Sequence, residues 1–381
     1  MPPSKLPGVG TTIFTVMSQL AADQGAIDLS QGYPDFAVPA PLLARVEHHL
    51  RAGHNQYAPM AGLPALREAI AEKTAALYGV ECDPGEQITI TSGATEALFA
   101  AIHAFVHPGD EVILLDPAYD AYDPAVRLAG GRPVHLPLSG PGFDLDLDRL
   151  AAAIGPRSRM LVLNTPHNPT GAVLPASRIE ALARLLRDSD LLVVSDEVYE
   201  HMVFDGEEHA SLLRYPALFE RSLVISSFGK TCHATGWKIG YVVAPRPLSA
   251  EFRRVHQFVQ FCVATPLQHA LADYLRSDPQ HYRELPAFYQ RKRDLFCQLL
   301  AGSRFRLTPS AGTYFQLADY SAISDEPDVD FARRLTRDAG VAAIPVSVFY
   351  AAPPADQRLL RFCFAKADET LRAAAERLEA L

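Results

Sequence analysis

Short apolar segments alternate with amphipathic stretches through the middle of this 381-residue chain. Segments with the length and apolar content of buried strands lie at 88–91, 112–115, 133–136, 158–164, 191–194, 223–225 and 239–243. Stretches with helical spacing separate several of them, at 95–105, 121–129 and 177–187. Strands of this kind are typical of a mostly parallel sheet that helices cover on both faces. The pattern predicts an α/β fold with seven strands in its main sheet.

The two ends of the chain follow a different pattern. Helices are expected at 11–22, 42–51, 63–78, 248–260, 265–277 and 279–301. From residue 303 onward, short strands mix with helices, at 313–317, 329–338, 359–364 and 369–380. A chain of this length exceeds one simple core. We expect a large domain over 45–285 and a smaller α+β domain formed by 1–44 together with 286–381.

Composition and charge narrow the class of protein. The formal net charge is −9 with both signs interspersed, which argues against a nucleic-acid-binding surface. No run of 18 or more apolar residues is present, so no membrane association is expected. The five cysteines are scattered without a Cys-x-x-Cys pair, so neither a disulfide framework nor a metal site is assigned. With an N-terminus that lacks a signal-peptide core, these features predict a cytoplasmic globular protein.

Polar residues stand where the apolar strands end. Ligands of a doubly wound sheet bind beyond the carboxyl ends of its strands, so these residues are the candidates for chemistry. Segment 92–95 follows the first strand and opens a helix, where backbone N–H groups and two hydroxyls favour a phosphate. An ordinary N-cap explains it equally well. Tyr119 and Asn168 follow two further strands as a candidate aromatic face and amide, with packing and turn chemistry as the alternatives.

Charged residues follow the next two strands. Asp196 ends one of them, and a buried carboxylate there needs a cationic partner such as a protonated heterocyclic nitrogen, unless it caps a helix. Lys230 and Lys238 follow the strand at 223–225. A desolvated lysine beside a second cation has a lowered pKa, so its neutral amine can attack a carbonyl carbon. The alternative for both lysines is a solvated basic loop.

Together these strand ends describe a pocket for a phosphorylated aromatic aldehyde, pyridoxal 5′-phosphate (PLP). Lys230 would hold the aldehyde carbon, and Asp196 would hold the ring nitrogen. Segment 92–95 and Lys238 would hold the phosphate. Proteins tune PLP in this way because a protonated ring is the better electron acceptor.

Several motifs carry a resemblance to a known family across essentially the whole chain. They are Gly10-Thr-Thr-Ile-Phe14, Ser30-Gln-Gly-Tyr-Pro-Asp-Phe36, Asn164-Thr-Pro-His-Asn-Pro-Thr-Gly171, Ser195-Asp-Glu-Val-Tyr199, segment 226–241 and Leu360-Arg-Phe-Cys-Phe-Ala-Lys366. The chain resembles class I, fold-type I PLP-dependent aminotransferases, in the branch of the kynurenine and bacterial methionine aminotransferases. The resemblance implies a large domain with a mostly parallel seven-stranded sheet, a smaller α+β domain, and a homodimer with shared active sites.

The resemblance also implies a role for each candidate residue. Lys230 would be the attachment point of PLP and then the base that moves a proton between substrate and cofactor. Asp196 would pair with the ring nitrogen, and Tyr199 and Asn168 would bond the phenolic oxygen. The remaining cofactor contacts would come from Gly93, Ala94, Thr95, Tyr119, Ser227, Lys238 and, from the other subunit, Tyr57.

Substrate binding follows from the same resemblance. Arg361 would bind the α-carboxylate of the substrate through two parallel hydrogen bonds, and Asn168 and Gly32 would contribute to the same site. The alternative for Arg361 is a surface salt bridge, which is the more common role of an arginine. The candidate side-chain pocket is apolar and aromatic: Ile13, Phe14, Tyr33, Tyr314, Phe315 and Phe349. Cys232 stands where this branch usually carries an aromatic residue, and we expect it at the pocket wall.

The expected function is ping-pong transfer of an amino group from an L-amino acid to a 2-oxo acid. No second carboxylate clamp has motif support, which disfavours Asp as the donor and favours Met, Phe, Tyr, Gln or kynurenine. Cysteine-S-conjugate β-lyase activity on the same site is the alternative. A PLP-binding sensor of a transcription regulator is a further possibility, and the sequence offers no DNA-binding region for it.

Overall fold

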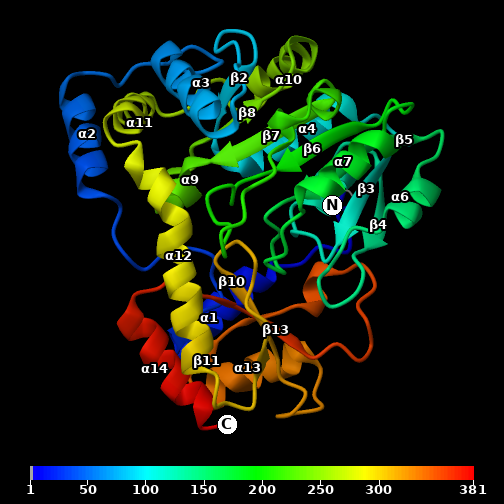
Figure 1. The fold of residues 1–381 in the computed structure, drawn as a ribbon, viewed down its shortest axis with the longest axis vertical. Helices are drawn as coiled ribbons and strands as arrows, with labels where there is room; N and C mark the ends of the chain where they lie inside the picture. The colour runs from blue at the N-terminus through cyan, green and yellow to red at the C-terminus, as the bar shows by residue number, and fades with distance from the viewer. Residues whose placement is uncertain (1–2) are drawn as a thin grey trace.

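The computed structural model describes residues 3–381, which form two lobes along the longest axis of the molecule (Figure 1). The main sheet lies in one lobe, with strand order β2-β8-β7-β6-β5-β3-β4. Its strands are β2 (Ile88–Thr91), β3 (Glu111–Asp116), β4 (Arg132–Pro137), β5 (Ser158–Asn164), β6 (Leu192–Asp196), β7 (Ser222–Ser227) and β8 (Gly240–Val243). Neighbours are parallel except at β8, which runs antiparallel to both β2 and β7. The seven predicted strands and the mostly parallel sheet are confirmed.

Helices cover both faces of this sheet. The helices of this lobe are α2 (Ala40–Arg51), α3 (Pro64–Tyr78), α4 (Gly93–Phe105), α5 (Tyr122–Leu128), α6 (Leu147–Ala153), α7 (Ala176–Leu185), α8 (Pro216–Phe219), α9 (Phe228–Thr231), α10 (Arg246–Val259) and α11 (Thr265–Ser277). Of these, α2 packs on α11 at the outside of the lobe. Successive strand residues point to opposite faces, so β3 contributes Val112 and Leu114 to one core and Ile113 and Leu115 to the other. Both faces of the central strands are buried, which explains why β3, β5 and β6 are largely apolar.

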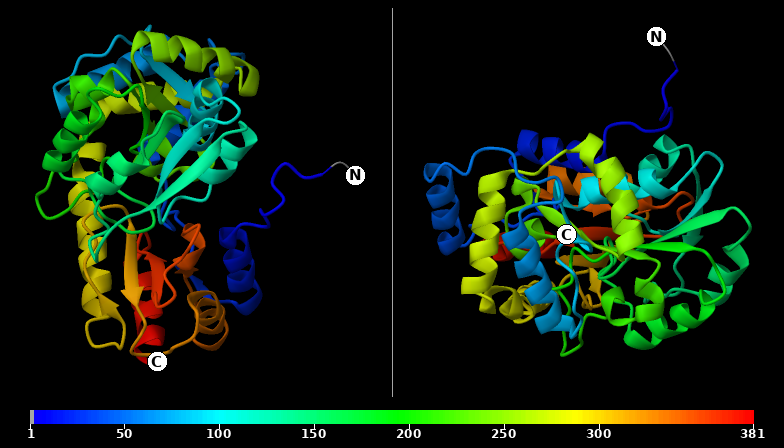
Figure 2. Two further views of the ribbon diagram at one scale, coloured as in Figure 1. Left: turned by 90° about the vertical axis from the view of Figure 1, so that its right-hand side faces the viewer. Right: turned by 90° about the horizontal axis from the view of Figure 1, so that it is seen from above.

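The other lobe is built from both ends of the chain. It holds the sheet β12-β13-β10-β9 and the parallel pair β1-β11. Its elements are α1 (Ile13–Gln24), β1 (Ile27–Asp28), β9 (Arg306–Leu307), β10 (Phe315–Asp319), α13 (Asp328–Asp338), β11 (Val341–Ala342), β12 (Ile344–Pro345), β13 (Leu359–Cys363) and α14 (Asp368–Glu379). Figure 2 shows α1 against the C-terminal elements of this lobe. Pairing of β1 with β11 ties the N-terminal segment to residues more than 300 positions away, which local sequence patterns do not reveal.

One long helix, α12 (Gln280–Leu299), runs from the first lobe into the second (Figure 1). It contains Pro286, whose missing N–H breaks the regular hydrogen-bond ladder. We propose the domain division expected from the sequence, 45–285 against 1–44 with 286–381. In that division the second boundary falls inside α12, beside this proline.

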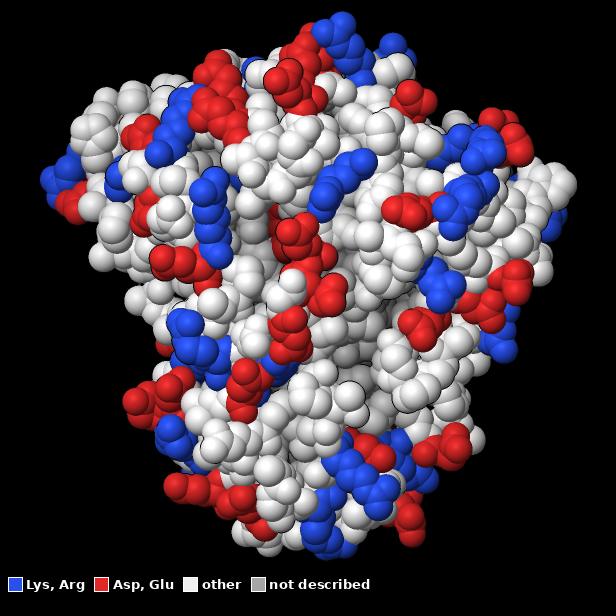
Figure 3. Space-filling model, in the orientation of Figure 1, with Lys and Arg blue, Asp and Glu red and all other residues white. Residues whose placement is uncertain are grey.

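Two surface properties complete the description. Acidic and basic side chains are interspersed over the face seen in Figure 3. Within residues 3–381, no helix is both long and apolar enough to cross a membrane.

Candidate active site

A cavity of about 350 Å³ lies at the carboxyl ends of the parallel strands, where both lobes contribute side chains. Its volume is that of a small-molecule site. The last residues of β5, β6 and β7 all line it, because parallel strands end at the same edge of a sheet. The lining residues are Phe14, Gln31, Gly32, Gly93, Ala94, Thr95, Leu98, Tyr119, Tyr122, Asn164, Asn168, Asp196, Val198, Tyr199, Ser227, Gly229, Lys230, Thr235, Lys238, Phe315 and Arg361.

Lys230 reaches this cavity from the short helix α9, directly after β7. Its Nζ donates to the hydroxyl of Tyr314 at 2.8 Å and to the carbonyl of Gly32 at 3.2 Å. Burial lowers the pKa of Lys230 to about 8, and the positive charge of Lys238 acts in the same direction. At pH 7 a lysine with this pKa is neutral in roughly one molecule in ten, against fewer than about one in a thousand for an ordinary lysine, so a nucleophilic amine is available.

Asp196 ends β6 and is 4% exposed. Its Oδ2 accepts a hydrogen bond of 2.7 Å from the hydroxyl of Tyr122, and its Oδ1 accepts one of 3.3 Å from the backbone N–H of Val198. Among residues 3–381 it forms no salt bridge, and burial raises the pKa of its carboxyl to about 6. A buried carboxylate without a cation is costly, so this group suits a cationic ligand atom.

A further group of lining residues is suited to an anion. Helix α4 begins among them at Gly93, and Lys238 Nζ donates to the hydroxyl of Thr95 at 3.2 Å. Ser227 caps α9 by accepting from the N–H of Gly229 at 3.2 Å, and its side chain faces the same space. A helix N-terminus, an ammonium group and two hydroxyls provide the donors that a phosphate binds.

Arg361 enters from β13 of the smaller lobe and is 1% exposed. Its Nη1 donates to Oδ1 of Asn168 at 2.7 Å, and its Nη2 donates to the carbonyl of Ser30 at 2.9 Å. Its Nε is buried without a hydrogen-bond partner. The guanidinium lies 3.9 Å from the ring centroid of Phe315. A buried cation without an acidic partner is suited to bind a carboxylate.

Aromatic side chains and one amide close the cavity between these groups. Tyr199 lies edge-on to Tyr314 and Phe315, with ring centroids 5.1 and 5.9 Å away. Burial raises the pKa of Tyr199, and burial raises that of Tyr119 to about 12, so both hydroxyls are protonated near neutral pH. The backbone N–H of Asn168 donates to Oδ1 of Asn164 at 2.7 Å, which fixes the loop that carries the amide.

Most predicted site residues come together here. Tyr314 and Phe349 do not line the cavity themselves but lie beside Lys230 and Arg361, and three further predicted residues lie elsewhere. Ile13 packs in the core and Tyr33 is 45% exposed, and neither lines the cavity. Phe14 is the cavity residue from that part of the chain. Tyr57 is 81% exposed, with its ring 5.3 Å from that of Phe261. The proposed roles of these three residues stay predictions.

The expectation for Cys232 was wrong. This residue is 1% exposed and does not line the cavity, because it ends α9 with its side chain in the protein core. Burial raises the pKa of its thiol to about 12, so the thiol stays protonated. Cys232 therefore occupies a packing position.

Sequence reasoning also missed residues of the site. Tyr122 is the clearest case, because its hydroxyl bonds Asp196 directly. Its place three residues after Tyr119, at the start of α5, was the available signal. Gln31, Asn164 and Thr235 also line the cavity without having been singled out.

Comparison with known proteins identifies the family. The profile of aminotransferase classes I and II matches residues 24–378, nearly the whole chain. The chain belongs to the class I and II aminotransferases. It is therefore a transaminase, and its cofactor is PLP.

Individual aminotransferases match over their full length. Methionine aminotransferase from Escherichia coli K12 is 54% identical over 381 residues, covering 100% of this chain and 98% of that protein. Kynurenine–oxoglutarate transaminase 1 from mouse is 35% identical and covers 98% and 96%. The solved E. coli methionine aminotransferase has a TM-score of 0.98 with full coverage of both chains. A Thermus thermophilus aspartate aminotransferase variant has a TM-score of 0.90 at 33% identity, again covering 100% of this chain and 99% of that one.

The cavity of this aminotransferase fits PLP. The unpaired Asp196 matches a protonated ring nitrogen, and the donors around Thr95 and Lys238 match a phosphate. Lys230 supplies an amine with a lowered pKa. The comparisons support amino-acid transamination and give no specific support to the β-lyase alternative.

Proposed function

We propose that this aminotransferase takes its amino group from an L-amino acid with an uncharged side chain, of the methionine, aromatic, glutamine or kynurenine type. A 2-oxo acid would receive the group in a ping-pong sequence. The observation that carries this proposal is the setting of Arg361. The lysines that line the cavity have other tasks, so Arg361 is left to bind a carboxylate. Aromatic rings of Phe14, Phe315 and Phe349 surround its guanidinium.

Residues of both lobes would hold the cofactor. Bound PLP supplies a reactive aldehyde carbon and an electron-accepting ring. Lys230 would attach at the aldehyde carbon, Asp196 would keep the proton on the ring nitrogen, and Asn168 and Tyr199 would donate to the phenolic oxygen. The phosphate and ring face would be bound by Gly93, Ala94, Thr95, Ser227, Lys238 and Tyr119.

Lys230 would also transfer the proton during turnover. Once the substrate amine replaces it, its Nζ is a free amine whose pKa burial lowers to about 8. The hydroxyl of Tyr314 and the carbonyl of Gly32 lie within hydrogen-bond reach and would keep that Nζ in place. A base with a pKa near the working pH removes and returns a proton most efficiently.

The substrate would be oriented by its α-carboxylate. Arg361 would bind it, and Asn168 and Gly32 would contribute from the other side. A Cβ on residue 32 would lie 2.8 Å from the ring of Phe315, so only glycine lets the backbone pass this close to the pocket. The apolar rings exclude water around the remaining side chain and leave a charged one without a partner.

We also propose a homodimer whose sites are shared. Four large apolar side chains lie exposed on neighbouring segments: Tyr57, Phe258, Val259 and Phe261. Exposed apolar groups of this kind mark an interface, and Tyr57 would reach the cofactor phosphate of the other subunit from it. Replacing Phe258 with Asp should shift the protein from dimer to monomer in light scattering. A wild-type protein that is monomeric at micromolar concentration would refute the proposal.

A cytoplasmic location completes the proposal. All five cysteines are free thiols, and three of them are buried. Unpaired cysteines are usual in proteins of a reducing compartment.

A steady-state panel of amino donors against several 2-oxo acids tests the substrate assignment. We expect kcat/KM for Met and Phe to exceed that for Asp by at least about tenfold, because burying an unpaired carboxylate costs at least about 1.4 kcal/mol. Glutamine as a donor shows whether the charge of a side chain or its polarity matters, since its side chain is polar but uncharged. Asp as the best donor would contradict the proposal.

A further inference from the structure

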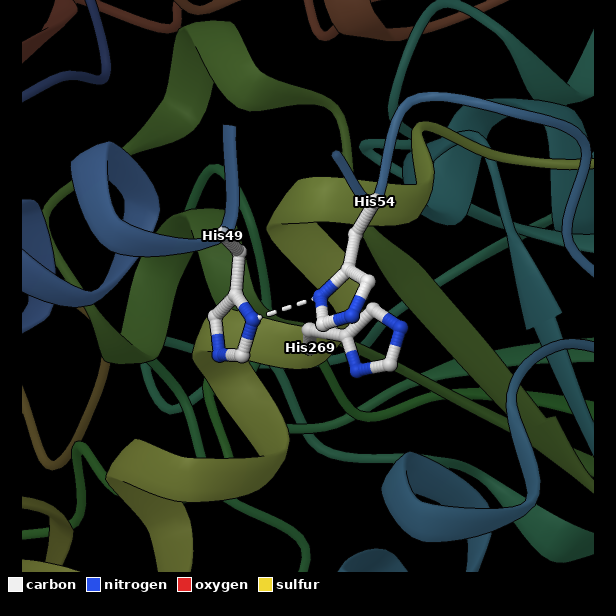
Figure 4. A group of neighbouring side chains, drawn as sticks. All are labelled: His49, His54 and His269. Carbon is white, nitrogen blue, oxygen red and sulfur yellow. Dashed lines mark hydrogen bonds between the residues drawn. The ribbon is translucent and has the colours of Figure 1, made fainter. Parts of the chain in front are cut away.

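Three histidines gather outside the active site, where α2 and α11 pack against each other. His49 lies near the end of α2, His54 in the loop after it, and His269 on α11 (Figure 4). One ring nitrogen of each lies within 4.8 Å of the others. None of the three lines the active-site cavity, so transamination does not account for the cluster.

Asp273 determines which nitrogen of His49 is available. Nε2 of the buried His49 ring lies 2.8 Å from Oδ2 of Asp273, and the ring must donate in this contact. In the neutral ring the lone pair is then on Nδ1. That Nδ1 lies 2.8 Å from Nδ1 of His54. A metal-binding histidine usually donates one ring N–H to a carboxylate and binds the metal through its other nitrogen. His49 has this arrangement, because its Nδ1 faces the ring of His54.

The stacking of the rings agrees with neutral imidazoles. The ring of His269 lies 4.1 Å from that of His54 and 5.0 Å from that of His49, nearly parallel to both. Closely stacked rings of this kind suit uncharged imidazoles, each of which keeps a lone pair for a ligand.

We propose that His49, His54 and His269 bind a divalent transition-metal ion, with Zn²⁺ as the natural occupant. Neutral imidazoles suit Zn²⁺, Cu²⁺, Ni²⁺ and Co²⁺, and water completes the coordination while Asp273 orients His49. With metal–nitrogen bonds of about 2.0–2.1 Å, nitrogens on a tetrahedral ion lie about 3.3 Å apart. His54 and His269 are only partly buried, so modest side-chain rotation brings them to that spacing. Binding displaces the proton shared by His49 and His54.

The ion would act as a clamp and take no part in the transamination. It joins the end of α2, the following loop and α11, which are otherwise held by side-chain packing and a few hydrogen bonds, such as that from Arg45 to Ser277. His54 lies three residues before Tyr57, in the same loop. Occupancy would therefore restrict the loop that carries Tyr57 and stabilise the folded state by mass action.

Titration of the holoenzyme with Co²⁺ tests the site, using protein without a polyhistidine tag and without amino acid present. The readouts are the visible absorption of protein-bound Co²⁺ and its displacement by Zn²⁺. We expect one ion per chain and a higher Tm with Zn²⁺. Absence of stoichiometric binding would overturn the proposal, and the rings would then share only a proton.

Matched variants locate the ion. Asp273→Asn removes the partner that orients His49 and should weaken Co²⁺ binding by about tenfold. His54→Gln and His269→Gln each remove a ligand, and each should weaken Co²⁺ binding by about tenfold to a hundredfold or more. His48→Gln is the control, because that exposed neighbour on α2 is not one of the three cluster ligands. Cofactor absorbance and circular dichroism verify folding in every variant. Unchanged affinity in both His54→Gln and His269→Gln would place the ion elsewhere and refute the assignment.

Discussion

Arg361 donates a hydrogen bond of 2.7 Å to Asn168, and this contact joins a strand of the smaller lobe to the loop after β5. The same guanidinium keeps a buried Nε without a partner. Burying such a cation is unfavourable until an anion binds it. The missing acidic partner and the unpaired Nε of Arg361 therefore favour a substrate carboxylate.

Replacing Arg361 with Lys should lower kcat/KM for methionine by about a hundredfold, because an ammonium group cannot form the two parallel bonds of the fork, worth roughly 2–3 kcal/mol. Cofactor absorbance should stay unchanged. Steady-state kinetics measure the effect, with Arg51→Lys on the exposed face of α2 as control. A loss of threefold or less would remove Arg361 from the carboxylate site.

Replacing Lys230 with Ala should abolish turnover while most of the fold remains. Lys230 is the cavity amine whose pKa burial lowers to about 8, whereas Lys238 is assigned to the phosphate, and removal of Lys230 also takes away the proton carrier. The absorption band of the attached cofactor should be lost, and circular dichroism should stay close to wild type. Retained transamination would refute the assignment of Lys230.

The pH dependence of cofactor attachment reports the state of Lys230. Burial lowers its pKa to about 8, so in the cofactor-free enzyme the neutral amine predominates above that pH. The rate of PLP attachment should rise with pH up to about 8 and level off there, whereas an ordinary lysine would continue to about 10.4. Stopped-flow absorbance measures this profile.

Lys238 provides the control for that profile. Its charge helps to lower the pKa of Lys230, so Lys238→Met should move the midpoint upward as well as slow attachment. A midpoint near 10 in the wild type would show that Lys230 is solvated in the free enzyme.

The buried pair of Lys73 and Glu200 predicts a stability effect away from the chemistry. Its atoms are 2.8 Å apart and both side chains are at most 4% exposed. Although burial opposes it, Lys73 keeps the pKa of Glu200 below its usual value, and Glu200 raises that of Lys73. Lys73→Met should lower the stability of the holoenzyme by about 3–5 kcal/mol, because an uncompensated carboxylate remains.

Thermal unfolding of the holoenzyme measures this change as a drop of several degrees in Tm. Arg51→Met removes an exposed ion pair with Glu47 and should change Tm little. The double variant Lys73→Met with Glu200→Gln should recover part of the loss. Equal effects of the buried and the exposed substitutions would contradict the prediction.

The order of elements and most of the site could be predicted from local patterns. Most strands of the main sheet are short apolar runs, and β2, β3, β5, β6 and β7 end in polar residues at the edge where ligands bind. Asp196, Asn168 and Lys230 could therefore be placed together from the sequence alone. Arg361 needed the family resemblance, since its strand belongs to another lobe.

Contacts between distant segments could not be predicted in this way. Tyr122 bonds Asp196 across 74 positions, and Cys232 points into the core although its neighbour Lys230 faces the cavity. The clustering of His49, His54 and His269 likewise depends on how α2 packs against α11. The sequence by itself determined the alternation of strands and helices and the chemical groups at the strand ends, because both depend on neighbouring residues. Only the tertiary structure decided which side chains face one another, because side-chain direction depends on packing between elements far apart in the chain.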